Sequence, residues 1–292
     1  MNTNNKYIEF KKKRELGDIL TDTFAFLRQE GKSLFSILMK TCGIPFVLLL
    51  LASAYYTYSS SNLFDPVSIS NGEMFNSGGI LISLFLMLAA LLAFYGLLFG
   101  SVLHYIKAYT DNKGTIDYNT VIQGVRKDFG SILGLGALSG IIIFFGFVLC
   151  FLPGIYLYVP MSLVFAILVF RNVSVTDAIS ESFQLVKNEW WITFATLFVL
   201  GIIIWIISMI FSVPALIYTF TKTFTAASEG TYANPAAMVD WVFIGLNAIA
   251  SAAQYALYVI TAIASAFIYF NLNERKYATG ALEQIDSLGN DS

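Results

Sequence analysis

Few side chains in this 292-residue sequence have the types and spacing that catalysis or metal binding requires. The single histidine, His104, has no carboxylate or cysteine at ligand spacing around it, so we expect neither a metal site nor a proton relay. Cys42 and Cys150 form no CxxC motif and lie in apolar segments, where a cysteine packs as a small apolar residue. We therefore predict no catalytic, cofactor-binding or metal-binding residue and no enzyme activity.

Regularly spaced polar residues run along the last apolar segment of the chain. They recur every three or four residues and therefore share one face of a helix. One interpretation is a polar cavity or route for a lipid head group or solute, and the other is hydrogen bonding to neighbouring helices. No Asp or Glu lies in the apolar segments, which favours packing over a route. The candidate residues are Asn247, Ser251, Gln254, Tyr258, Thr261 and Ser265.

The composition is that of a membrane protein. Apolar residues make up 57% of the chain and charged residues 12%, with a mean hydropathy of +0.70, whereas soluble domains carry roughly a quarter charged residues. The net charge of −2 offers no basic surface for nucleic acid, which we exclude as a partner. Membrane lipids are the expected partners and other membrane proteins are further candidates. The oligomeric state is not indicated.

Six apolar segments have about the 20 residues that a membrane-spanning helix needs. They are Leu34–Tyr58, Gly79–Tyr105, Ile132–Leu152, Gly154–Phe170, Trp191–Phe211 and Val242–Tyr269. We predict an all-α polytopic membrane bundle of about six transmembrane helices in three hairpins. It comprises an N-terminal segment (1–33), a six-span membrane domain (34–270) and a disordered tail (271–292).

Spans three and four are separated only by Leu152-Pro153-Gly154, a strong turn signal that predicts a tight helical hairpin. The fourth span is short, so a re-entrant pair is the alternative. Every Lys and Arg except Lys222 falls on one side of the predicted spans. Basic residues mark the cytoplasmic side, so both termini are predicted to be cytoplasmic.

A short amphipathic segment precedes each predicted hairpin on this basic side. The three copies are Asp18–Glu30, Asp117–Asp128 and Asp177–Glu189, and each ends with an apolar, a basic, a polar and an acidic residue. Their apolar faces comprise Leu20, Phe24 and Leu27 in the first copy, Val121, Ile122 and Val125 in the second, and Ile179, Phe183 and Val186 in the third. This pattern predicts a threefold repeat of an interfacial helix followed by a hairpin, with loops of variable length.

The repeated segments have two interpretations. A helix lying in the membrane interface would place its apolar face toward acyl chains and its basic residue near lipid phosphate. Alternatively, the segments are connectors packed on the bundle, with basic residues that follow only the charge bias. The candidate lipid or partner contacts are Arg28, Arg126, Lys127, Lys187, Trp190 and Trp191.

Three short stretches resemble a bacterial membrane-protein family. They are Leu152–Leu157, Val169–Asn172 and Asp177–Ser182, within a similarity that covers about residues 120–210. The family includes the membrane domain of glycerophosphodiester phosphodiesterases and related six-helix proteins. The resemblance implies the six-helix fold in a bacterial inner membrane. It does not imply the activity, because the separate phosphodiesterase domain is absent from this sequence.

Two functions are compatible with these features. The first is a non-enzymatic inner-membrane scaffold or accessory factor in membrane or envelope assembly, which contacts lipid or partners through its interfacial helices. The alternative is a small transporter or lipid-handling protein with a polar route along the sixth helix.

Overall fold

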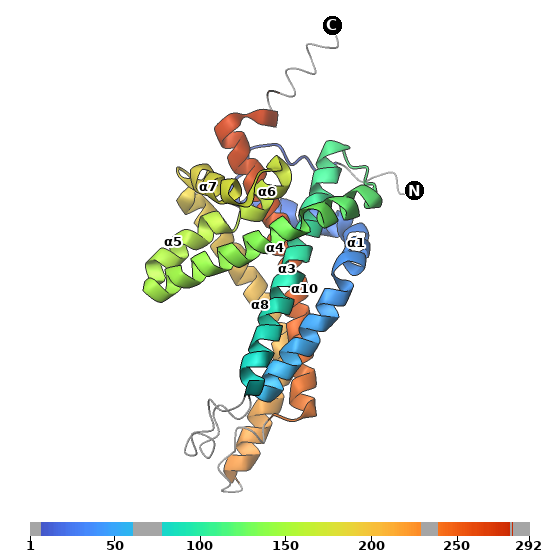
Figure 1. The fold of residues 1–292 in the computed structure, drawn as a ribbon, viewed down its shortest axis with the longest axis vertical. Coiled ribbons are helices and arrows are strands. Elements are labelled where there is room, and N and C mark those ends of the chain that lie inside the picture. Colours follow the sequence, from blue (N-terminus) through green and yellow to red (C-terminus); the bar gives the residue numbers. More distant parts are fainter. Residues whose placement is uncertain (1–6, 61–77, 229–238, 281, 283–292) are drawn as a thin grey trace. The chain divides into compact units, whose positions relative to one another are not determined.

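The computed structural model describes residues 7–60, 78–228, 239–280 and 282, which form helices and no strand (Figure 1). Six stretches, with α5 and α6 counted as one, are long and apolar enough to cross a membrane. The predicted all-α polytopic membrane bundle is therefore confirmed. In chain order the helices are α1 (Leu16–Ser59), α3 (Gly78–Asp111), α4 (Tyr118–Leu149), α5 (Phe151–Met161), α6 (Val164–Arg171), α7 (Val175–Val186), α8 (Trp190–Ser228) and α10 (Trp241–Tyr277).

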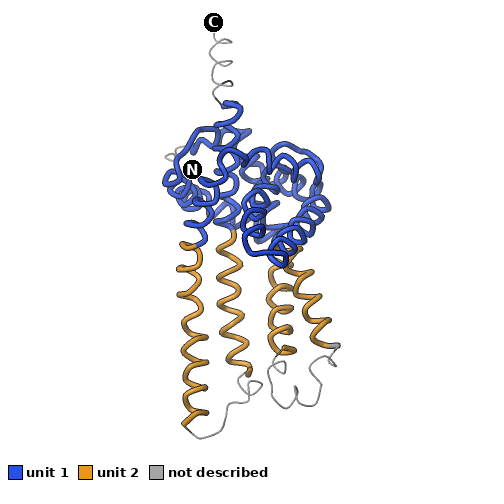
Figure 2. Tube along the Cα trace, turned by 90° about the vertical axis from the view of Figure 1, so that its left-hand side faces the viewer, with its two compact units in different colours: residues 1–42, 95–201, 259–292 blue, residues 43–94, 202–258 orange. Residues whose placement is uncertain are grey.

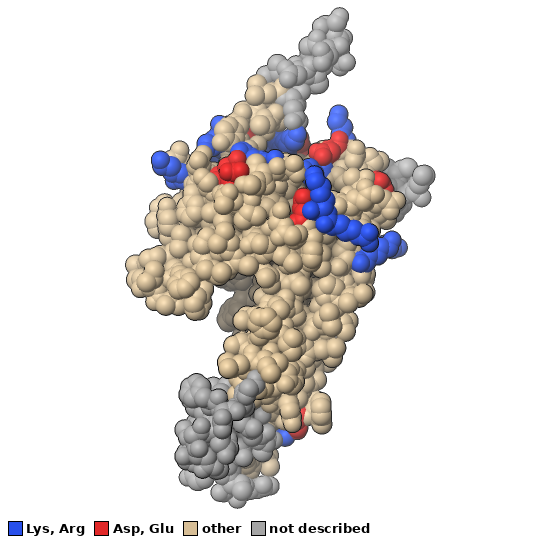
Figure 3. All heavy atoms as spheres, in the orientation of Figure 1, with Lys and Arg blue, Asp and Glu red and all other residues tan. Residues whose placement is uncertain are grey.

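The chain forms two compact units (Figure 2). Unit 1 comprises residues 1–42, 95–201 and 259–292, and unit 2 comprises residues 43–94 and 202–258. Among the described residues of unit 2, Lys222 and Asp240 are the only charged ones, and they form an ion pair with each other. All other described Lys and Arg residues belong to unit 1. Figure 3 shows the charged side chains of unit 1 gathered over α7, the N-terminal part of α4 and the C-terminal part of α10.

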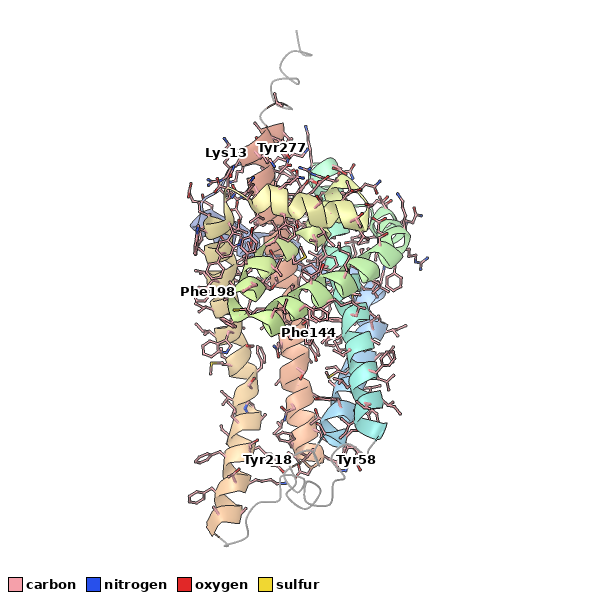
Figure 4. The ribbon with its side chains drawn as sticks, turned by 60° about the vertical axis from the view of Figure 1, so that its left-hand side comes forward. Lys13, Tyr58, Phe144, Phe198, Tyr218 and Tyr277 are labelled. Carbon is pink, nitrogen blue, oxygen red and sulfur yellow. The ribbon has the colours of Figure 1, made fainter. Side chains whose placement is uncertain are left out.

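Unit 2 presents apolar side chains outward. Leu51 on α1, Phe85 on α3 and Ile210 on α8 are 62%, 71% and 66% exposed. Apolar exposure on this scale is unfavourable in water but suits contact with acyl chains. At one end of the unit, Tyr218 donates a hydrogen bond to Asp240 (2.5 Å), and Tyr58 lies at the same end (Figure 4). Aromatic and charged residues at helix ends are typical of a membrane–water interface.

The C-terminal part of α10 forms the centre of unit 1. Residues 262–274 of this part are buried, including Ile263 and Phe267 at 0% exposure. Phe10 stacks on Phe267 with a centroid separation of 4.2 Å, so the N-terminal segment belongs to the same core as the helices. Helix α10 also continues to Tyr277, through the first seven residues of the predicted tail. Residues 283–292 of that tail lie outside the described residues.

The α4–α5 hairpin differs in detail from the predicted turn. The chain reverses at Cys150, which is extended between the two helices, and Pro153 lies in the first turn of α5. Proline is tolerated there because its missing N–H would have no helical partner. Gly146 and Gly154 let the two helices pack closely. A Cβ at Gly146 would lie only 3.1 Å from the Gly154 Cα.

The fourth predicted span is interrupted. Helix α5 ends just after Pro160, and Ser162 and Leu163 separate it from α6. Figures 1 and 4 show α4 and α5 crossing the unit 1 parts of α3 and α10 instead of running beside them. The hairpin is therefore confirmed, while the re-entrant alternative for this pair remains a prediction.

The expected interfacial helices are separate helices in only one of three copies. The third copy is largely α7, which packs on α5 and α6 and is separated from α8. The first copy is the N-terminal part of α1, and the second is the N-terminal part of α4. In the first two copies the helical segment therefore continues into the following apolar helix, and its amphipathic, interfacial character remains a prediction. Gly31 and Gly130 follow Glu30 and Asp128 closely, but a helix tolerates an isolated glycine, and both helices continue through these positions.

Candidate lipid-contact face

The last four residues of the three repeated segments have matching environments in unit 1. Arg28, Arg126 and Lys187, which occupy the same position in each copy, are all exposed. The acidic residue two positions later is half-buried in each copy; these residues are Glu30, Asp128 and Glu189. The threefold repeat itself remains a prediction.

Each of the three carboxylates contacts a different side chain from another helix. Tyr105 donates a hydrogen bond to Glu30 (Oη to Oε2, 2.8 Å). His104 lies beside Asp128 (Nε2 to Oδ2, 3.1 Å). Arg275 lies 3.8 Å from Glu189 (Nη1 to Oε2). The carboxylates thus hold the segments to α3 and α10 and leave the preceding cation unneutralised.

The partner of His104 was missed in the sequence. Asp128 comes from α4, 24 positions away, so it is not at any local ligand spacing. Pairing with one carboxylate makes His104 a structural residue that fixes α4 on α3. Within the described part of the chain, no group of three or more His, Cys, Asp or Glu residues has the arrangement of a metal site.

Capping residues start two of the segments. Asp117 accepts hydrogen bonds from the Asn119 amide (3.0 Å) and the Thr120 hydroxyl (2.8 Å) at the start of α4. These two bonds, the Thr120 bond first, lower the pKa of Asp117. Ser174 accepts from the Asp177 amide (3.2 Å) at the start of α7. Side-chain oxygens at this position satisfy N–H groups that lack helical partners.

The buried face is offset by one residue from most of the predicted face in the first and third copies, whereas in the second copy the predicted residues Val121 and Val125 are buried. In the first copy Ile19, Thr23 and Phe26 are buried, whereas Leu20, Phe24 and Leu27 are only half-buried. In the third copy Ala178, Ser182, Leu185 and Val186 are buried, and Ile179 and Phe183 are half-buried. Helix α1 turns Phe26 inward because its ring meets those of Phe10 and Tyr109, each at a centroid separation of 5.2 Å.

A second class of cations in unit 1 is used inside the protein. Arg14 donates to the Phe10 carbonyl (2.7 Å) and to Asp22 (2.8 Å). Arg171 donates to Glu181 (2.7 Å) and Asn273 (2.8 Å), which joins α6 to α7 and α10. Their sequence neighbourhood does not reveal this role, because the partners lie on other elements or up to 102 positions away.

The cations of the repeated segments differ from these internal ones. Arg28, Arg126, Lys127 and Lys187 form no ion pair with any residue that the structure describes. All four are exposed. We call these four residues the free basic set. They are available to contact an anionic surface or ligand outside the protein.

The two candidate tryptophans have different environments. The indole N–H of Trp190 donates to the Tyr156 carbonyl (3.3 Å), and its ring stacks on Tyr156 and Phe194 at 5.8 and 5.2 Å. Trp190 therefore joins α8 to α5. Trp191 is 76% exposed and is free to lie in a membrane interface.

The residues of the polar stripe on α10 differ in their burial and hydrogen bonding. Asn247 and Ser265 donate to carbonyls of their own helix, those of Phe243 (2.9 Å) and Ala262 (2.8 Å). Gln254 is exposed, while Ser251, Tyr258 and Thr261 are half-buried. These two hydrogen bonds therefore lie within α10, and both interpretations of the stripe, a polar route and hydrogen bonding to neighbouring helices, remain predictions.

Three hollows described in unit 1 are lined by residues outside the stripe. The first, about 310 Å³, lies between α1, α3 and α4. The second, about 250 Å³, lies where the α7–α8 connection meets the end of α10. The third, about 170 Å³, surrounds the Arg171–Glu181 ion pair. The opposite charges of this pair cancel each other.

Comparison of the chain with protein-family models, curated proteins and solved structures finds no match. The resemblance to the membrane domain of glycerophosphodiester phosphodiesterases therefore remains a prediction. The function has to be inferred from the geometry of the chain itself.

Proposed function

We propose that the chain is a non-enzymatic scaffold or accessory factor in assembly of the bacterial inner membrane or envelope. In this proposal unit 1 faces the cytoplasm, and the free basic set contacts anionic lipid head groups of the inner leaflet. The observation that carries the proposal is the exposed, unneutralised cation at the same position of all three repeated segments, Arg28, Arg126 and Lys187. The acidic residue two positions later is half-buried against another helix in each copy, so it does not cancel the charge.

The attraction between the free basic set and an anionic membrane surface is substantial. A Lys or Arg held near an anionic leaflet contributes about 1 kcal/mol of attraction. Four such residues fixed on packed helices bind without the entropic cost of ordering a flexible basic tail. The same residues are exposed in a unit whose internal cations already have protein partners, so their removal leaves the fold intact.

The test is the lipid preference of the purified chain in bilayers. Quenching of tryptophan fluorescence by brominated lipids gives the relative association constant of phosphatidylglycerol against phosphatidylcholine. We expect the wild type to prefer the anionic lipid roughly fivefold at the affected sites, the equivalent of about 1 kcal/mol. Exchanging the whole free basic set for Gln should bring the ratio close to one.

A charge-conserving variant is the matched control. Exchanging Arg28 and Arg126 for Lys, and Lys127 and Lys187 for Arg, keeps the charge and should keep the preference. High salt should weaken it in both proteins, because the screening length falls to about 3 Å at 1 M. Equal ratios for the wild type and the Gln variant would refute the proposal.

The alternative function, a transporter or lipid-handling protein with a polar route along α10, has less support. None of the three hollows contains a residue of the stripe. The proposal uses the resemblance to the glycerophosphodiester phosphodiesterase membrane domain in one respect only. That respect is the six-helix topology that the resemblance implies.

A further inference from the structure

One hollow of unit 1 is an open groove between α1, α3 and α4. Leu97 of α3 and Ile122, Val125 and Phe129 of α4 supply apolar side chains. Lys40 of α1 and Arg126 of α4 supply the charges. The volume of about 310 Å³ is in the lower range of ligand sites, enough for a phosphate and the beginning of an acyl chain.

The charge of this groove is uncompensated. No carboxylate is among its lining residues, and neither Lys40 nor Arg126 forms an ion pair with a residue in the described ranges. The Lys40 ammonium lies 5.9 Å from the ring centroid of Tyr118, a contact that leaves its charge in place. The nearest acidic residue on α4, Asp128, is turned toward His104. The groove therefore attracts an anion.

Lys40 also lies within an apolar part of α1. Its neighbours Met39 and Ile44 are 56% and 78% exposed, as expected for side chains that face lipid. A lysine at such a place is unfavourable in hydrocarbon, and its long side chain reaches toward phosphate at the interface. The groove thus combines an anion-attracting end with walls that match an acyl chain. The second hollow, of about 250 Å³, also has cations among its lining residues. However, its lining includes the carboxylate of Glu189, which lies near Arg275.

We infer that this groove binds one anionic phospholipid molecule, with its phosphate between Lys40 and Arg126 and the start of an acyl chain along Leu97, Ile122 and Phe129. The inference deepens the proposed function, on which it rests, by naming a specific site and ligand class within the basic face. An occupied groove joins α1, α3 and α4 through a lipid, so the membrane composition determines how firmly these helices are held together.

Native mass spectrometry of the full chain tests the site. The protein is delipidated in mild detergent and incubated with phosphatidylglycerol or with phosphatidylcholine of the same acyl chains. We expect one retained phosphatidylglycerol per chain and much less phosphatidylcholine. The double variant Lys40→Gln/Arg126→Gln should lower the retained fraction about tenfold, since two charge-assisted contacts are lost. Inorganic phosphate at millimolar concentration should not displace the lipid, because it lacks the acyl chain.

Two further variants separate this site from general surface attraction. Lys13→Gln/Lys32→Gln removes the same charge from exposed positions of unit 1 outside the groove and outside the free basic set, and should keep the retained lipid. Leu97→Trp keeps both charges but fills the groove, and should lose the retained lipid while keeping the bilayer preference for anionic lipid. Melting curves in detergent check that each variant is folded.

The outcomes distinguish the two proposals. Equal loss in both double variants, or retention in Leu97→Trp, would overturn the groove as the site. If no single lipid is retained but the Gln variant of the free basic set still loses its bilayer preference, the groove fails and the proposed function stands. Displacement by inorganic phosphate would show an anion site without lipid specificity and would also overturn the inference.

Discussion

Replacing Arg14 by alanine is expected to destabilise the protein by about 3 kcal/mol. The Arg14 side chain is fully buried in unit 1 and donates to three carbonyl groups, those of Glu9, Phe10 and Lys12. It also forms an ion pair with Asp22 (2.8 Å). Removing one member of a buried pair leaves its partners unsatisfied, which costs about 3–5 kcal/mol. We use the lower value because Asp22 is 23% exposed and is partly solvated.

Replacing Arg14 should disrupt the surrounding segment before it unfolds the whole chain. Arg14 folds residues 9–12 around its guanidinium, which lies 4.7 Å from the Phe267 ring centroid on α10. Hydrogen exchange in detergent should therefore show loss of protection around residues 8–22. Lys13→Ala is the matched control, because Lys13 is exposed and its loss should cost less than about 0.5 kcal/mol. Equal melting temperatures for the two variants would contradict the structural role of Arg14.

Replacing Gly124 by alanine is expected to destabilise the chain, although alanine normally favours a helix. A Cβ at Gly124 would lie 2.5 Å from the Nδ1 atom of His104. The imidazole has little room to move, since it is buried and its Nε2 atom lies 3.1 Å from Asp128. Overpacking of this kind costs about 1–3 kcal/mol. The substitution would push α4 away from α3.

Gly130, on the same helix, is the matched control. A Cβ there meets no atom within 4 Å, so Gly130→Ala should stabilise the helix by about 0.5–1 kcal/mol. The two substitutions should therefore shift the melting temperature in opposite directions. If both raise it, His104 does not restrict the approach of α4 to α3.

The spans and the charge distribution were predictable because they depend on composition. Long apolar segments must be helical in a bilayer, whatever their neighbours are. The segregation of Lys and Arg also follows from their order in the chain, and the two units confirm it, with Lys222 alone in unit 2. These features require no knowledge of which helix packs on which.

The remaining features depend on partners that are distant in the sequence. The inward face of α1 is set by Phe10, Tyr109 and the other rings around Phe26, so local periodicity predicted a face one residue away. The groove was missed because its cations are Lys40 and Arg126, on different helices. Lys40 within the predicted first span was a usable signal, since a charged residue among lipid-facing ones needs a polar partner.

Contact of the free basic set with the inner leaflet requires unit 1 to face the cytoplasm. Single cysteines at Lys187 or Tyr58, in a chain that carries Cys42→Ser and Cys150→Ser, can be labelled in bacterial spheroplasts with a membrane-impermeant maleimide. Lys187 is an exposed residue of unit 1, and Tyr58 lies at the charged end of unit 2 and is 60% exposed. We expect Tyr58→Cys to be labelled in intact spheroplasts and Lys187→Cys only after permeabilisation. Labelling of Lys187→Cys in intact spheroplasts would place the free basic set outside the cell and contradict the proposed contact with the inner leaflet.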